Sequence, residues 1–391
     1  MSDGGRRHGE AARRSRGAAE GLFFPVAAIY AALVVPLSVH GMRSGEPLLP
    51  GFATAGGHAH ELLFGFALAV AAGFLVTRAT PAQRGALVAL WLAGRVAFLT
   101  WPGSVLAFAA NFAFAALLGA LVIPQFLRGA KKLRNRTIGP LLSVLCLAVL
   151  VFHVAGLTAR TWLQWLVLHE TVLLFATLML FMGGRIIAPA AAGAIQRAGG
   201  HLEARVQPRI EGGLLIAMIG AVSLSAVPGG RAMAGACAGL AGLLAVIRLA
   251  RWRLPACRGR PDLWCLGLGY AWLGGGLVLF GVASITGSPP FAAAIHAITV
   301  GALGTLTSGV MARVRLTRLK RDPGREWSLP WMALLITAAA AIRISGVGGD
   351  FGLGLSAVLW SGAFVLLLTL FVRVPARRGD RRAVGGEVQG T

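Results

Sequence analysis

Residues 57–78 read GHAHELLFGFALAVAAGFLVTR, an apolar run that opens on two histidines and a glutamate. A run of about 20 apolar residues is long enough to cross the hydrocarbon core of a bilayer as an α-helix. The stretch therefore predicts a transmembrane helix. Because ionisable side chains are costly in hydrocarbon, His58, His60 and Glu61 at its mouth also mark a candidate functional site.

The remainder of the chain has the same character. Of its 391 residues 56% are hydrophobic and 13% are charged, whereas soluble domains average about 25% charged residues. Roughly twelve apolar runs follow one another, at 21–41, 57–78, 85–102, 104–127, 137–157, 161–187, 210–228, 231–250, 263–286, 289–313, 327–346 and 350–373. The sequence therefore predicts an all-α polytopic membrane protein with a single transmembrane domain over residues 21–373. We expect residues 1–20, which are basic, and residues 374–391 to be polar cytoplasmic tails rather than removed signals.

Basic residues recur in every second connection between these runs. Clusters follow the fourth, sixth, eighth and tenth runs, at 128–136, 185–209, 248–260 and 313–325, and the other connections carry one or two basic residues at most. The positive-inside rule therefore places both termini and the even-numbered loops in the cytoplasm. The formal net charge of +23 lies in these loops, so we predict the lipid bilayer, and not nucleic acid, as a partner.

Six of the eight histidines lie in or at the ends of apolar runs, and the predicted topology turns all six toward the non-cytoplasmic side. They are His40, His58, His60, His153, His169 and His296. Imidazole is the commonest metal ligand and a frequent axial ligand of haem. A lone histidine of this kind is more often a packed or interfacial residue. Six histidines toward the same side of the membrane predict a metal or haem site. His58 and His60 should project to nearly opposite faces, so one metal is not expected to bind both.

Charged residues accompany these histidines. Glu61 and Glu170 each follow a histidine, and adjacent residues on a helix point about 100° apart. We therefore expect each glutamate to accept a hydrogen bond from another helix's histidine or to relay protons, with exposure to water as the alternative. The cytoplasmic halves of the runs lack carboxylates, which disfavours a proton pump driven from that side. Four arginines toward the outer side are candidates for pairing with haem propionates or for interfacial anchoring: Arg95, Arg160, Arg231 and Arg343.

Three stretches resemble motifs of the NnrS protein family. HAHELLFGF at 58–66, continuing to AGFLVT at 72–77, resembles the signature of the family's second span. GGRII at 183–187 resembles the motif that ends the sixth span, and HAITVGALG at 296–304, with Met311 to Arg313, resembles the one in the tenth. The resemblance extends from about residue 20 to 320. The chain departs from the family pattern after the second and tenth spans, at 82–85 and 317–321, and is similar to a divergent member.

The resemblance implies a twelve-helix bacterial inner-membrane protein that carries b-type haem and copper. It also implies a link to nitric oxide metabolism, denitrification and protection from nitrosative stress. Histidines on the second, sixth and tenth helices further resemble the haem–copper oxidases, whose twelve helices form three pseudo-repeats of four. By that analogy His60 and His296 are predicted haem ligands, and His169 would bind copper or a second haem, with His58 and His153 as further metal candidates. The seventh run has no histidine, whereas the oxidases use that helix for copper.

The leading functional prediction is a haem- and copper-binding protein that binds, senses or reduces nitric oxide. A nitric oxide reductase-like oxidoreductase would also need an electron donor, with two electrons and two protons for each pair of nitric oxide molecules. The alternative is a twelve-helix secondary transporter with a histidine-lined proton-coupling site. Such transporters bind their substrates near the bilayer midplane, whereas the histidines here lie toward one surface.

Overall fold

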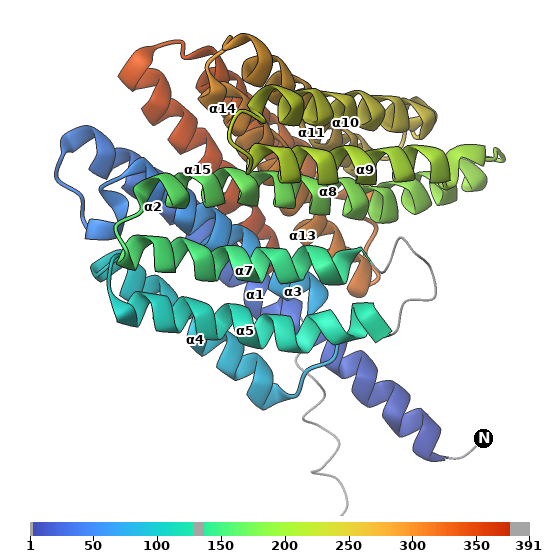
Figure 1. Cartoon of the computed structure of the whole chain (residues 1–391). Coiled ribbons are helices and arrows are strands. Elements are labelled where there is room, and N and C mark those ends of the chain that lie inside the picture. Colours follow the sequence, from blue (N-terminus) through green and yellow to red (C-terminus); the bar gives the residue numbers. More distant parts are fainter. Residues whose placement is uncertain (1–2, 129–136, 376–391) are drawn as a thin grey trace, which may run out of the picture.

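The described part of the chain forms a bundle of twelve helical spans that lie side by side (Figure 1). The computed structural model describes residues 3–128 and 137–375, with side chains from residue 19, and all regular structure in these ranges is helical. Spans 1 to 6 are α1 (Asp3–Ser44), α2–η2–α3 (Ala55–Leu75), α4 (Pro81–Thr100), α5 (Val105–Arg128), α7 (Ile138–Leu157) and α8 (Thr161–Arg197). Spans 7 to 12 are α9 (Pro208–Ser225), α10 (Arg231–Arg251), α11 (Pro261–Thr286), α12–η5–α13 (Phe291–Arg318), α14 (Ser328–Ser345) and α15 (Gly349–Arg373).

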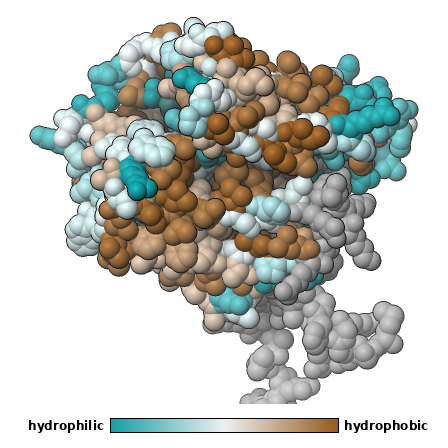
Figure 2. All heavy atoms as spheres, in the orientation of Figure 1, coloured by the Kyte–Doolittle hydropathy of each residue, from teal (hydrophilic) through white to brown (hydrophobic). Residues whose placement is uncertain are grey.

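Eleven of these spans are long and apolar enough to cross a membrane. The exception is α4, whose 20 residues include Arg84 and Arg95. Large apolar side chains such as Ile216 and Val372 are 74% and 79% exposed, and Figure 2 shows hydrophobic residues across the middle of the visible face, with hydrophilic ones toward its left and right sides. Apolar surface of this extent requires lipid rather than water around it. The prediction of an all-α polytopic membrane protein is confirmed.

The bundle has two chemically different ends. The odd-numbered connections, from 45–54 to 346–348, meet at what we call the histidine end, on the left of Figure 1. The connections at 198–207, 252–260 and 319–327 meet at the opposite, arginine end. All but the first residue of the predicted basic cluster at 128–136, and most of the predicted tail at 374–391, lie outside the described residues. The predicted basic tail at 1–20 is continuous with the first span, because α1 begins at Asp3.

Spans 2 and 10 share an uncommon construction. Each begins with a six-residue α-helix that ends on a histidine, His60 in α2 (Ala55–His60) and His296 in α12 (Phe291–His296). Each continues as a π-helix, η2 (Glu61–Ala67) or η5 (Ala297–Gly304), and then as an α-helix, α3 (Leu68–Leu75) or α13 (Thr305–Arg318). π-Helical turns are rare and occur mostly at functional sites. Span 6, by contrast, is a continuous α-helix of 37 residues.

Glycines in span 6 make room for buried side chains of other spans. A Cβ atom on Gly183 would lie 2.6 Å from the Tyr270 ring, and one on Gly184 would lie 2.2 Å from Arg248 Nη2. Arg248 is buried, with Nη2 2.5 Å from Glu211 Oε1 and Nη1 donating to the Leu180 carbonyl at 3.0 Å. The Gly-Gly pair therefore accommodates a charged group that ties spans 6, 7 and 8 together.

Replacing Gly184 by alanine is expected to lower the Tm of the detergent-purified protein. The new methyl group would displace the Arg248 guanidinium, and overpacking of this kind costs about 1–3 kcal/mol. Gly275→Ala is the matched control, because nothing lies within 4 Å of a Cβ atom there. That substitution should leave the Tm unchanged or slightly raised, since alanine favours helix. Equal melting temperatures for the two variants would contradict this account of the glycine pair.

Candidate functional site

A cavity of about 710 Å³ lies near the histidine end. Three of the predicted histidines line it: His58 from α2, His169 from α8 and His296 from α12. The rest of its wall is mainly apolar and aromatic, and includes Val35, Leu62, Phe66, Trp165, Phe291 and Trp360. Sites for cofactors and drug-sized ligands usually measure about 300–1,000 Å³ and are lined in this way. We call this space the histidine cavity.

Two of these histidines are held with one ring nitrogen occupied. His296 Nδ1 lies 2.6 Å from the Ala292 carbonyl, which can only accept, so Nδ1 carries the proton. His58 Nδ1 lies 2.6 Å from Ser38 Oγ, which itself donates to the Val35 carbonyl at 3.0 Å. The serine is therefore the acceptor of the His58 Nδ1 proton. In both neutral rings Nε2 keeps a free lone pair, which is the form in which imidazole binds a metal.

The cavity also has cationic side chains. Arg343 of α14 lines it and is half-buried, and no ion pair joins Arg343 to a carboxylate within the described part of the chain. Arg43 lies at the exposed rim, with Nη2 3.5 Å from Asp350 Oδ2. A positive charge that faces an apolar cavity favours an anionic group on whatever occupies the cavity.

A second histidine group is buried between spans 2, 3, 4 and 5. His60 Nε2 lies 3.2 Å from His153 Nε2, and His60 Nδ1 lies 2.7 Å from Glu61 Oε1. Arg95 Nη1 donates to the same Glu61 oxygen at 2.8 Å, and Nη2 donates to Asn111 Oδ1. His60 and Glu61 are 0% exposed. The rings of Phe98, Phe152 and Phe64 surround the His60 ring. The Phe98 ring is stacked on it, with 3.5 Å between the two ring centroids.

The structure thus separates the predicted ligands into two groups. The histidine cavity contains His58, His169 and His296, whereas His60 and His153 form the enclosed pair. The proposed haem ligands His60 and His296 are not brought to one site. The expectation that His58 and His60 face different ways is confirmed. The described residues contain no group of three or more histidine, cysteine, aspartate or glutamate side chains that could hold a metal ion.

The prediction that each glutamate accepts a hydrogen bond from another helix's histidine was wrong for both, and the proton-relay alternative stays a prediction. Glu61 contacts its own neighbour His60, with Oε1 2.7 Å from His60 Nδ1, at the point where the π-helix η2 begins. Glu170 accepts a hydrogen bond from Ser225 of α9 and has no hydrogen bond to a histidine among those in the described region. Glu61 therefore orients His60 and neutralises Arg95 within one enclosed network.

The four predicted arginines occupy different surroundings. Only Arg343 lines the histidine cavity, and Arg95 belongs to the enclosed network. Arg160 is exposed before α8, and Arg231 is exposed with its guanidinium carbon 5.1 Å from the Phe291 ring centroid. His40 is also exposed and does not line the histidine cavity.

Sequence reasoning missed several partners and some carboxylates. Ser38 and Asn111 carried no signal, because a single serine or asparagine in an apolar run is commonplace. The statement that the cytoplasmic halves lack carboxylates was wrong for the ends of the spans at the arginine end. Glu211 and Asp262 lie in the first turns of α9 and α11, and Glu20 lies within α1. Each carboxylate pairs with arginine. Glu20 lies 2.9 Å from Arg318, and Glu211 lies 2.5 Å from Arg248. Asp262 pairs with Arg260 at 2.9 Å and also with Arg313.

Comparison with known proteins identifies the family. A model of the NnrS protein family matches residues 21–378, which reach from α1 through α15. No curated protein and no solved structure shows significant similarity to the chain. The match extends beyond the motifs at 58–77, 183–187 and 296–313 and confirms the resemblance seen in them. The chain therefore belongs to the NnrS family.

Proposed function

We propose that this protein binds haem in the histidine cavity and that it binds, senses or reduces nitric oxide there. The observation that carries the proposal is the state of His58 and His296, each held through Nδ1 with Nε2 free at the wall of one cavity. Membership of the NnrS family supports a link to nitric oxide. The ligand pair proposed here replaces the pair drawn from the oxidase analogy, since His60 is enclosed elsewhere.

The cavity suits haem in size, polarity and charge. Its volume of about 710 Å³ and its aromatic, apolar wall fit a macrocycle. Arg343 offers a positive charge to a propionate, whereas Arg43 at the rim is already paired with Asp350. When bound, the haem would supply an iron centre to which nitric oxide can bind and through which electrons can pass. The protein would contribute the imidazoles, the cations and the exclusion of water, with His169 as a third imidazole facing the occupant.

The enclosed pair is the better candidate for copper. Its two Nε2 atoms are 3.2 Å apart, close to the roughly 3.3 Å expected between two nitrogens that bind one tetrahedral ion at about 2.0 Å. Imidazole suits copper, and Glu61 would fix the His60 ring by accepting from Nδ1. This pair provides two ligands. The described residues offer no third histidine, cysteine or carboxylate ligand at the pair, so any further ligand of those kinds would be a small molecule or ion.

The orientation in the membrane follows from charge. The arginine end would face the cytoplasm, and the histidine end would face the outer side of a bacterial inner membrane. An electron donor and protons for any reduction of nitric oxide would then arrive from the outer side, where the histidine cavity lies. Reductase-like turnover, as opposed to binding or sensing alone, would appear as nitrous oxide formation by the reduced protein.

The proposal predicts a specific spectrum for the detergent-purified protein. Oxidised and dithionite-reduced samples are expected to show haem bands, and the reduced bands should shift when nitric oxide is added. Metal analysis of the same sample should give iron in proportion to protein, with copper as the second metal. A protein that stays colourless after reconstitution with haem would overturn the haem proposal and favour the transporter interpretation of the histidines.

A further inference from the structure

Three cavities lie in series between the same spans, from the histidine end to the arginine end. After the histidine cavity comes a smaller chamber of about 90 Å³, followed by a cavity of about 420 Å³ lined in part by Glu20 and Arg318. Spans 2, 6 and 10 contribute to all three. Leu303 lines both the histidine cavity and the chamber, whereas Met182 and Phe74 line both the chamber and the last cavity.

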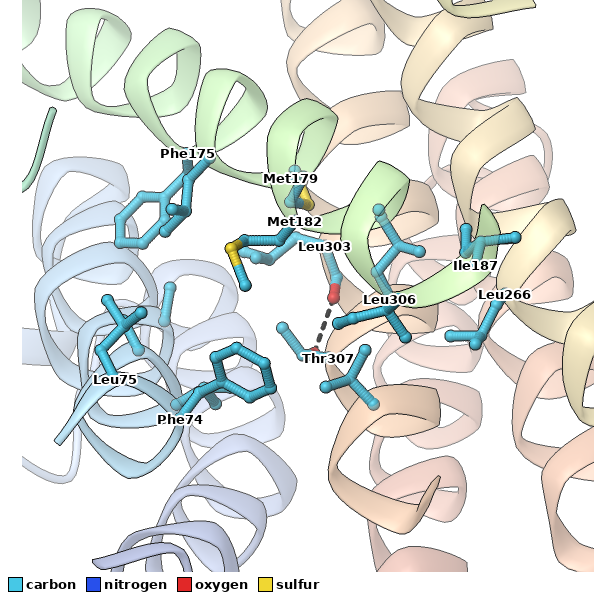
Figure 3. A pocket seen from close by; sticks show the side chains of 17 residues that line it. Phe74, Leu75, Phe175, Met179, Met182, Ile187, Leu266, Leu303, Leu306 and Thr307 are labelled. Atoms are coloured by element: carbon cyan, nitrogen blue, oxygen red, sulfur yellow. Dashed lines mark hydrogen bonds between the residues drawn. The ribbon is translucent and has the colours of Figure 1, made fainter. Parts of the chain in front are cut away.

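The lining of the chamber is apolar except for one threonine. Figure 3 shows side chains of α3, α8, η5 and α13 converging on it, with Met182 reaching across its middle. The labelled residues are Phe74, Leu75, Phe175, Met179, Met182, Ile187, Leu266, Leu303, Leu306 and Thr307. Thr307 is the only hydroxyl-bearing residue in the lining, and its Oγ1 donates to the Leu303 carbonyl at 2.6 Å.

This composition determines what the chamber can hold. A water molecule needs two to four polar partners to be stable in a cavity, and the Thr307 hydrogen is already committed. Apolar cavities of this kind stay dry and take up apolar ligands such as xenon. An ion would lose its hydration without compensation. The volume of about 90 Å³ accommodates a diatomic molecule but not a haem.

We propose that the chamber is a binding site for small uncharged molecules of diatomic size. It shares the side chain of Leu303 with the histidine cavity. Nitric oxide and dioxygen belong to this class and dissolve in the hydrocarbon that surrounds the spans. Leu303 separates the chamber from the histidine cavity, and Met182, an unbranched and adaptable side chain, separates it from the arginine end. The site does not depend on haem being bound.

Xenon is the probe, read by NMR of the protein labelled with ¹³C at its eight methionine methyl groups. Met179 and Met182 line the chamber. Met332 is buried elsewhere at 1% exposure, and Met233, 62% exposed, reports xenon dissolved in detergent. The Met179 and Met182 signals are expected to shift and saturate as xenon pressure rises. The Met332 signal should not shift, and the Met233 signal should shift in proportion to xenon pressure without saturating.

Filling the chamber should remove this response. Ala71 lines the chamber at 7% exposure, so Ala71→Phe is expected to abolish the saturable shift and Ala71→Leu to weaken it. Ala109→Phe places the same ring on an exposed position and should leave the shift intact. If Ala71→Phe fails to fold, as judged by the Met332 signal, Ala71→Leu decides. Absence of a saturable shift in the folded wild type, or an undiminished shift in the folded Ala71 variants, would overturn the site, whatever the haem spectrum shows.

Discussion

The double replacement of His58 and His296 by alanine is expected to abolish haem binding, measured as pyridine haemochrome per protein. The two rings line one cavity and keep Nε2 free, so their loss removes the predicted ligands together. Ser38→Ala should have a graded effect, because the serine holds the His58 ring by accepting from Nδ1. Loss of a hydrogen bond behind a metal ligand weakens metal affinity by about 10–100-fold.

The matched comparison is the double replacement of His60 and His153 by alanine. These rings face each other in the enclosed network and do not line the histidine cavity. We expect this variant to keep its haem and to lose copper, and His40→Ala, at an exposed position, to keep both. Loss of haem on replacing His60 alone, with haem retained in His58→Ala, would restore the oxidase analogy and contradict the assignment made from the cavity.

Replacing Arg95 by methionine is expected to destabilise the protein by about 3–5 kcal/mol, the usual cost of removing one partner of a buried ion pair. Arg95 Nη1 and Glu61 Oε1 are 2.8 Å apart, with side chains 4% and 0% exposed. Without the guanidinium, Glu61 would remain in an enclosed, aromatic environment with only His60 to balance its charge. The effect should appear as a large fall in Tm in detergent.

A second substitution tests this explanation. Adding Glu61→Gln to Arg95→Met removes the uncompensated charge, so the double variant should recover a substantial part of the lost stability. Arg231→Met changes an exposed arginine at the same end and should alter stability by less than about 0.5 kcal/mol. If Arg95→Met melted like Arg231→Met, the enclosed ion pair would not stabilise the bundle.

The fold could be predicted from the sequence because hydropathy and loop charge are enough to define the spans. The run at 85–102 is recognisable despite Arg95, and α4 (Pro81–Thr100) lies there with Arg95 neutralised by Glu61. Boundaries were less accurate. The sixth run was expected to end at 187, but α8 continues to Arg197 through the small residues that follow Arg185. An arginine at a helix end can extend toward water without ending the helix.

The histidine-rich end was also predictable, but the grouping of its side chains was not. The spacing of His58 and His60 was sufficient to place them on different faces. The partners of each ring depend on neighbours from distant parts of the chain, such as Ser38 and His153, and on the π turns after His60 and His296. Periodicity analysis assumes 3.6 residues per turn and cannot register a wider turn. The analogy with the oxidases therefore paired two histidines that the bundle keeps apart.

The π-helices at 61–67 and 297–304 also matter for how related chains are aligned. A π turn holds one residue more than an α turn, so a relative that lacks one residue here would close the turn into regular α-helix. A single-position gap at either place would then record a change of helix type, not the loss of a loop. It would rotate the histidine-bearing turn by about 100° against the part of the span beyond it.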